Sequence, residues 1–138
     1  MSDMLPPVRV GIIGLGRMGQ NHLRVLSLLS GAEIAFVYDV DQAHAAALGA
    51  QAGVPAATNL DTALERVDAV VIASPTVTHD DYARLAARYV DNIFVEKPVT
   101  DRLDTSESLR ELVRERGLNL QVGFIERFNP ALQELRRR

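Results

Sequence analysis

Three glycines near the N-terminus constrain the fold more than any other feature of the sequence. Gly14, Gly16 and Gly19 follow directly on the apolar run 8–13, and a stretch with helical spacing of leucines, 18–29, follows them. A glycine-rich turn between a strand and a helix lets the backbone approach an anion, which the helix N-terminus attracts. The pattern therefore predicts a strand–turn–helix unit that opens onto a phosphate group.

Strand and helix patterns alternate along the rest of the chain. Apolar runs predict six strands, at 8–13, 33–38, 54–58, 68–73, 92–95 and 118–122. Helical patterns lie between them, at 18–29, 41–52, 60–66, 78–89 and 104–116, and another begins after residue 130. This alternation predicts an α/β Rossmann fold, a doubly wound parallel sheet of about six strands with helices on both faces. The Rossmann domain is expected to comprise residues 1–123.

Composition excludes several classes of function. The formal net charge is −3, and no block of like charge exceeds Arg136–Arg138, so we expect no nucleic-acid partner. Absence of cysteine excludes disulfides, thiolate nucleophiles and Cys-based zinc sites, and we expect no metal site. There is no signal-peptide pattern and no apolar run as long as a membrane span, so a cytoplasmic protein without a membrane partner is expected.

Asp39 extends the glycine pattern into a dinucleotide fingerprint. It ends the second predicted strand, 20 residues beyond Gly19, where a carboxylate accepts hydrogen bonds from the adenosine ribose. A carboxylate there repels a 2′-phosphate and favours NAD, whereas Arg17 could pair with that phosphate and leaves NADP open. The alternatives are an S-adenosylmethionine site and a glycine-rich turn without a ligand. The predicted cofactor loop consists of Gly14, Leu15, Gly16, Arg17, Met18 and Gly19.

A second group of candidate residues follows the strand predicted at 68–73. Open α/β sheets bind ligands at the carboxyl ends of their strands, so this loop is expected to border the nicotinamide ribose. Thr78 and Asp81 have the spacing of a capping box. His79 lies in the first helical turn and either bonds a ribose or substrate hydroxyl or is a surface histidine, whereas His22 and His44 lie within helices and receive no role. The loop residues are Ser74, Pro75 and Thr76.

Lys97 is the single lysine among 15 basic residues, and it lies between Glu96 and Pro98 at the end of the fifth predicted strand. Arginine does not release a proton at useful pH, whereas lysine does when its surroundings favour the amine. Oxidation of an alcohol needs a group that accepts or orients the hydroxyl proton. We therefore expect Lys97 to act at a substrate hydroxyl, with Glu96 holding it at the cofactor site. The alternative is a surface ion pair beside a turn.

These motifs together resemble the Gfo/Idh/MocA family, named for glucose–fructose oxidoreductase and inositol dehydrogenase. The resemblance runs from Val8 to Pro130 and rests on 14–19, on 73–76 with His79, and on 96–98. It implies an NAD(P)-binding Rossmann domain of an enzyme that moves hydride between a sugar, nucleotide-sugar or cyclitol alcohol and nicotinamide. It also implies a catalytic role for Lys97. The segment 121–130 is similar to the branch that oxidises UDP-N-acetylglucosamine-type sugars.

The resemblance further implies a C-terminal α/β domain that supplies much of the substrate site and the oligomer interface. We expect residues 124–138 to be the connection to this domain, which the chain does not include. The 138-residue chain alone is then catalytically incomplete, and its exposed surfaces favour self-association into a homo-oligomer. The alternative is a non-catalytic dinucleotide-binding module, either a sensor or a partner subunit.

Overall fold

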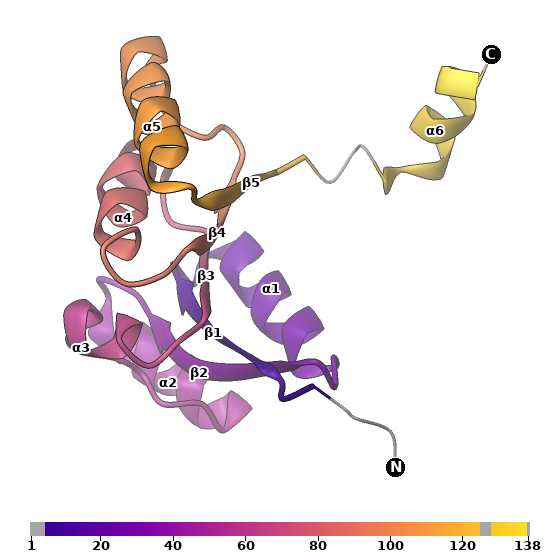
Figure 1. Ribbon diagram of the computed structural model, residues 1–138. Coiled ribbons are helices and arrows are strands. Elements are labelled where there is room, and N and C mark those ends of the chain that lie inside the picture. The colour runs from indigo at the N-terminus through magenta and orange to yellow at the C-terminus, as the bar shows by residue number, and fades with distance from the viewer. Residues whose placement is uncertain (1–4, 125–127, 138) are drawn as a thin grey trace.

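Parallel strands form one sheet at the centre of the fold (Figure 1). The computed structural model describes residues 5–124 and 128–137. The strands lie in the order β2-β1-β3-β4-β5, and each neighbouring pair is parallel. Their bounds are β1 Val8–Ile13, β2 Ala32–Tyr38, β3 Ala69–Ile72, β4 Asn92–Glu96 and β5 Asn119–Gly123. This arrangement confirms the predicted Rossmann-like α/β class.

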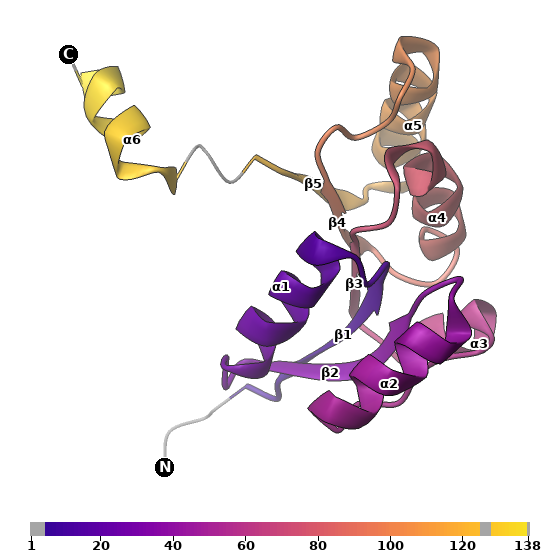
Figure 2. The same cartoon turned by 180° about the vertical axis from the view of Figure 1, so that it is seen from behind.

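Helices cover both faces of the sheet, as Figures 1 and 2 show. α1 and α2 pack on one face, while α3, α4 and α5 pack on the other. A short 3-10 turn, η1, precedes α4. The bounds are α1 Arg17–Ser27, α2 Gln42–Ala52, α3 Leu60–Leu64, η1 Thr76–Thr78, α4 His79–Ala86, α5 Leu103–Arg116 and α6 Pro130–Arg137.

Neighbouring residues of the central strands point to opposite faces, and both faces are buried. Val70 and Ile72 belong to the core beneath α3 and α4, whereas Val71 between them belongs to the core beneath α1. Ile12 and Ile13 divide between the two cores in the same way. A strand that is buried on both sides has no polar face, which is why these strands are continuous apolar runs in the sequence.

The strand predicted at 54–58 is wrong. This segment makes only an isolated bridge between Ala56 and Val37, so the described part of the chain has five strands rather than six. Two backbone hydrogen bonds hold it, from Val37 N–H to the Pro55 carbonyl and from Ala57 N–H to the Val37 carbonyl. Pro55 has no N–H to donate, and the chain turns into α3 soon afterwards, so a ladder does not extend.

The helices α3 and α4 begin differently. The side chain of Asn59 caps α3 by accepting the Thr62 N–H at 3.1 Å. Thr78 does not cap α4 with its side chain, which corrects the predicted capping box. The chain enters α4 through η1, so the Thr78 hydroxyl turns back to the Ser74 hydroxyl at 2.7 Å and to the Pro75 carbonyl at 2.6 Å.

The last helix, α6, lies apart from the two layers that enclose the sheet (Figure 1). Its apolar residues Leu132 and Leu135 are exposed. Across the described ranges, no helix combines the length and the apolar character that crossing a membrane would need.

Packing beneath α3 can be tested with a matched pair of substitutions. Leu64 is fully buried in the larger core, so Leu64→Ala is expected to lower the free energy of unfolding by about 2–5 kcal/mol. Leu103→Ala removes the same atoms at a position that is 76% exposed, and we expect a change within about 0.5 kcal/mol. Urea unfolding followed by circular dichroism measures both. Equal losses in the two variants would contradict this packing.

Candidate dinucleotide site at the carboxyl edge of the sheet

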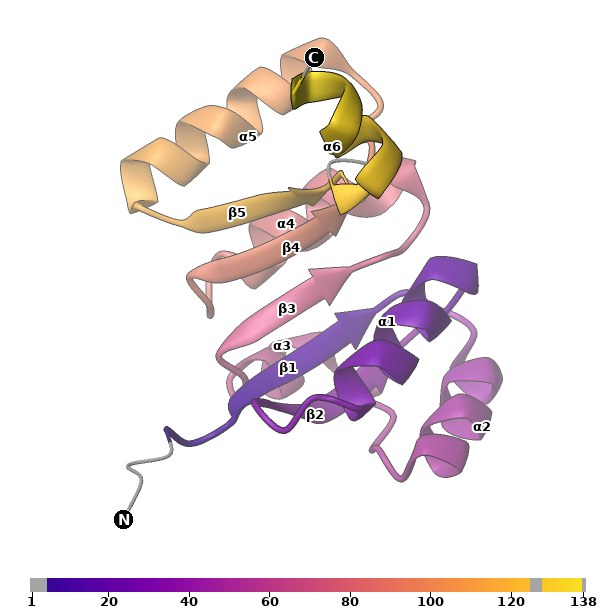
Figure 3. The ribbon, with the colours of Figure 1, turned by 90° about the vertical axis from the view of Figure 1, so that its right-hand side faces the viewer.

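Residues that the sequence analysis singled out in four separate segments lie at one edge of the sheet. All strands point the same way, so their carboxyl ends meet at that edge, where α1 also begins (Figure 3). Gly14 follows β1, Asp39 follows β2, Ser74 lies beyond β3 and Lys97 follows β4. The chain passes from β1 to β2 on one side and then returns to β3 on the other side of β1. Open α/β sheets bind ligands at the crevice where the strand order changes direction in this way.

The three glycines of the first turn meet different structural requirements. Gly14 has a φ of +95°, and a Cβ there would overlap the backbone nitrogen of Ser74. A Cβ on Gly19 would overlap the carbonyl oxygen of Gly14, so α1 could not begin so close to β1. By contrast, nothing lies within 4 Å of an ideal Cβ on Gly16. Gly14 and Gly19 therefore serve packing within the chain, whereas Gly16 borders open space that a ligand can enter.

The start of α1 fits an anionic group. Gly16 is the N-cap residue and has no side chain to accept the first helical N–H groups, and the first turn carries no acidic residue. Arg17 is exposed beside it, and Met18 is half-buried. Free N–H groups at the positive end of the helix dipole bind phosphates in other proteins. This turn therefore offers the N–H groups and the space that a pyrophosphate needs.

The peptide groups on either side of Leu15 are held by side chains from three elements. Its N–H donates to Asp39 Oδ2 at 2.9 Å, and its carbonyl accepts from Gln20 Nε2 at 3.0 Å. His44 Nε2, on α2, lies 2.8 Å from the same carbonyl oxygen and donates to it. The glycine-rich turn is thus fixed in shape by its own chain. Sequence reasoning missed Gln20 and His44, because a polar residue inside a helix gives no sign of its distant partner.

Asp39 is fixed at the end of β2 by backbone donors. Its Oδ2 accepts the Leu15 N–H and its Oδ1 accepts the Asp41 N–H, each at 2.9 Å. Each carboxylate oxygen has a second lone pair that can accept a hydroxyl proton. The group is therefore oriented in advance, and its chemistry fits the two hydroxyls of a ribose.

A hollow of about 90 Å³ joins the loops after β1, β2 and β3. Gly14, Asp39, Ser74 and Tyr82 are among its lining residues. The Tyr82 ring meets the Tyr38 ring edge-on at 6.3 Å between centroids. Burial raises the pKa of Tyr82, and the neighbouring Tyr38 and the Asp39 carboxylate raise it further. The Tyr82 hydroxyl is therefore neutral at physiological pH, and the residue lines this hollow with an uncharged polar group.

His79 is buried between the loops that follow β3 and β4. It is 1% exposed, so the surface-histidine interpretation is wrong. Its Nε2 lies 2.8 Å from the Ser74 carbonyl oxygen, and its Nδ1 lies 2.9 Å from the Pro98 carbonyl oxygen. Each ring nitrogen therefore faces a backbone carbonyl oxygen, and a bound hydroxyl would have to displace one of these two oxygens. The ring joins the two loops and thereby sets their spacing.

Lys97 and Glu96 do not form the side-chain pair that the sequence suggested. The Lys97 side chain is exposed, and no residue in the ranges that the structure describes forms an ion pair with its ammonium. Glu96 is 7% exposed, and its Oε1 lies 2.6 Å from Nε2 of His22 on α1. Its Oε2 accepts the backbone N–H of Lys97 at 3.3 Å. Glu96 therefore holds the Lys97 backbone and leaves the ammonium uncommitted.

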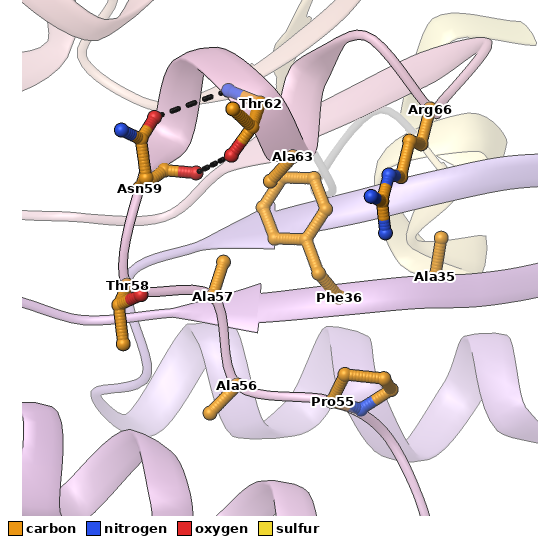
Figure 4. Close-up of a pocket in the computed structure, with 10 residues that line it drawn as sticks. All are labelled: Ala35, Phe36, Pro55, Ala56, Ala57, Thr58, Asn59, Thr62, Ala63 and Arg66. Carbon is orange, nitrogen blue, oxygen red and sulfur yellow. Dashed lines mark hydrogen bonds between the residues drawn. The ribbon is translucent and has the colours of Figure 1, made fainter.

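A larger hollow lies elsewhere, between β2, the segment after α2, and α3 (Figure 4). It has a volume of about 270 Å³. Small apolar side chains line much of it, and Asn59 and Thr62 bond each other at one end. None of the candidate residues predicted from the sequence lines it, so size alone does not identify the site.

Comparison with known proteins identifies the family of this chain. Residues 8–124 match the sequence model of the Gfo/Idh/MocA group, described as "Oxidoreductase family, NAD-binding Rossmann fold". The chain is 37% identical over 135 residues to the NAD(+)-dependent scyllo-inositol 2-dehydrogenase of Bacillus subtilis, covering 95% of this chain and 40% of the relative. The chain spans about 40% of the length of the curated relatives it matches.

Solved structures show the same fold. UDP-N-acetylglucosamine 3-dehydrogenase from Acidithiobacillus ferrooxidans superposes with a TM-score of 0.87 at 34% identity, over 96% of this chain and 44% of that one. A scyllo-inositol dehydrogenase from Lactobacillus casei, solved with NAD(H) and scyllo-inositol, superposes with a TM-score of 0.86 over 95% of this chain and 40% of that one. At 24% identity, this second likeness shows the fold alone. The family match covers most of the chain, which therefore belongs to the Gfo/Idh/MocA oxidoreductase family as its NAD-binding Rossmann domain.

Proposed function

We propose that this chain is the cofactor-binding part of a dehydrogenase that transfers hydride between NAD and a secondary alcohol of a sugar, cyclitol or nucleotide sugar. One observation carries the proposal: an open helix N-terminus, a fixed carboxylate and an uncommitted ammonium share one sheet edge. The relatives support the substrate class, because their names include inositol and UDP-N-acetylglucosamine dehydrogenases.

The glycine-rich turn and β2 are proposed to bind the adenosine half of the cofactor. The N–H groups of Arg17, Met18 and Gly19 receive the pyrophosphate, over the open space beside Gly16. The Asp39 carboxylate accepts the ribose hydroxyls, and its negative charge disfavours a 2′-phosphate. NAD, when bound, supplies the hydride acceptor.

The loops after β3 and β4 are proposed to serve the reacting end. Ser74, Pro75 and Thr76 border the nicotinamide ribose. Lys97 reaches the substrate hydroxyl, where its amine accepts the proton or its ammonium orients the oxygen. In this oxidation the hydride of the alcohol carbon would go to bound NAD and the proton of its oxygen would go to the Lys97 amine, or to water where the ammonium only orients the oxygen, so that a carbonyl remains. His79 acts here by spacing the two loops, since both of its ring nitrogens lie on backbone carbonyls.

The substrate itself is proposed to bind mainly to a region beyond this domain. The chain matches about 40% of the length of its relatives, and residues 124–138 are proposed to lead from the Rossmann domain, 1–123, toward a substrate domain. The second candidate function is a dinucleotide-binding sensor or partner subunit. It is favoured if the domain binds NAD yet supports no hydride transfer.

Gly16→Ala separates ligand binding from folding. Because nothing lies within 4 Å of the new methyl group, the free energy of unfolding should change by less than about 1 kcal/mol. NAD affinity should fall at least about tenfold, or ~1.4 kcal/mol, since the methyl group occupies the approach to the pyrophosphate. Gly31→Ala, which also has nothing within 4 Å, should change neither quantity. Calorimetric titration that finds full NAD affinity in Gly16→Ala would place the pyrophosphate elsewhere.

Asp39→Asn tests the choice of cofactor. Loss of the charge should reduce the preference for NAD over NADP by about tenfold, or ~1.4 kcal/mol, because the repulsion of a 2′-phosphate disappears. Asp41→Asn removes the same charge two residues away, from the cap of α2, and should leave the ratio within about twofold of wild type. Titrations with NAD, NADP and S-adenosylmethionine measure this. Binding of S-adenosylmethionine instead of NAD would overturn the proposal.

A chimera tests hydride transfer. Residues 1–124 replace the matching part of the UDP-N-acetylglucosamine 3-dehydrogenase from Acidithiobacillus ferrooxidans, with which the fold is shared. The chimera should form NADH from the nucleotide sugar, and Lys97→Arg within it should lower kcat by about 100-fold or more while NAD still binds. A chimera that binds both ligands and forms no NADH would favour the sensor or partner-subunit function.

A further inference from the structure

The buried carboxylate of Glu96 is paired with a histidine from the opposite side of the site. Glu96 ends β4, whereas His22 lies on α1, three residues beyond Gly19. His22 Nε2 and Glu96 Oε1 are 2.6 Å apart, and their side chains are 20% and 10% exposed. The contact joins the helix that begins at the glycine-rich turn to the strand that ends at Glu96, directly before Lys97.

Two neighbours fix the geometry of this pair. The His22 ring meets the Phe94 ring edge-on, with 5.2 Å between centroids and 70° between planes. Phe94 and Glu96 alternate along β4 and so share the face toward α1. On β5, Gly123 leaves room for the carboxylate, because a Cβ there would lie 2.9 Å from Glu96 Oε2. The His22 ring therefore lies against Phe94, and the missing side chain at Gly123 leaves the space that the Glu96 carboxylate occupies.

The pairing determines which partner the Glu96 carboxylate takes. A carboxylate removed from water requires hydrogen-bond donors, and the next residue carries an ammonium on a long flexible stem. His22 supplies a donor to Oε1, and the Lys97 N–H supplies one to Oε2. The Glu96 carboxylate thus has a donor at each oxygen without the ammonium, and within the described residues that ammonium has no ion-pair partner.

We propose that His22 is a positioning residue that holds the Glu96 carboxylate against α1 and so leaves the Lys97 ammonium free for the reacting hydroxyl. The inference deepens the proposed function, because it rests on the role given there to Lys97. Without the His22 donor, the carboxylate turns to Lys97, and the ammonium is withdrawn into an ion pair.

The sequence provides a direct probe, since Lys97 is the single lysine of the chain. Lysine labelled with ¹⁵N and ¹³C therefore gives NMR signals from this residue alone. His22→Phe keeps the ring beside Phe94 and removes the donor, whereas His22→Gln keeps an N–H donor and removes the ring. We expect His22→Phe to shift the Lys97 side-chain signals and to speed exchange of its amide proton at least about fivefold. His22→Gln should leave exchange within about twofold of wild type.

His44→Ala is the control for loss of a helix histidine, because His44 bonds the Leu15 carbonyl on the adenosine side of the site. It should leave the Lys97 signals in place. If His22→Phe does not fold, His22→Ala gives the same comparison. Unchanged Lys97 signals in the donor-free variant, or equal changes in His22→Phe and His22→Gln, would overturn the inference.

Turnover by the chimera described above connects the pair to the reacting end. His22→Phe should lower kcat of the chimera at least about threefold and leave NAD affinity within about twofold of wild type, because Lys97 acts at the substrate hydroxyl. His44→Ala should instead weaken NAD binding, since His44 holds the Leu15 carbonyl of the glycine-rich turn. An unchanged kcat in His22→Phe would overturn the inference while leaving the proposed function in place. Wild-type protein that does not bind NAD would overturn the proposed function, whereas the lysine signals would still decide whether His22 holds Glu96.

Discussion

The site depends on three backbone segments that meet with no side chain between them. Gly19 at the start of α1 touches the Gly14 carbonyl, and Gly14 in turn touches the backbone at Ser74. Any Cβ at Gly14 or Gly19 would push the helix or the β3 loop away. Because these segments lie so close, the start of α1 and the carboxyl ends of β1 and β3 form one continuous edge. A ligand that spans this edge meets the turn, the carboxylate and the later loops together.

Side-chain hydrogen bonds then fix the loops at that edge. Asp39 and His44 hold the peptide groups at Leu15, and His79 bonds the loops after β3 and β4. Most of these bonds join a side chain to a backbone group, so loop shape does not depend on a ligand. Binding to loops that are already ordered costs less conformational entropy than ordering them on binding. The edge is thus prepared for its cofactor by the fold itself.

The sequence predicts the parts of this site that depend on local pattern. The glycine spacing, Asp39 and the buried central strands are set by residues close together in the chain, and the structure places them as expected. The strand predicted at 54–58 is wrong because Pro55 has no N–H to donate to a hydrogen-bond ladder. The spacing of apolar residues does not reveal this missing donor. His22 received no role because its partner Glu96 is 74 residues away. A contact between side chains that are distant in the chain produces no repeating pattern in the sequence.

A crystal structure of this chain with NAD tests the central claim most directly, namely that one sheet edge binds the whole dinucleotide. The account predicts the pyrophosphate at the N-terminus of α1 beside Gly16, the adenosine ribose on Asp39 and the nicotinamide between the β3 loop and Lys97. A dinucleotide bound in the hollow beneath α3, or one whose nicotinamide lies away from Lys97, would contradict it.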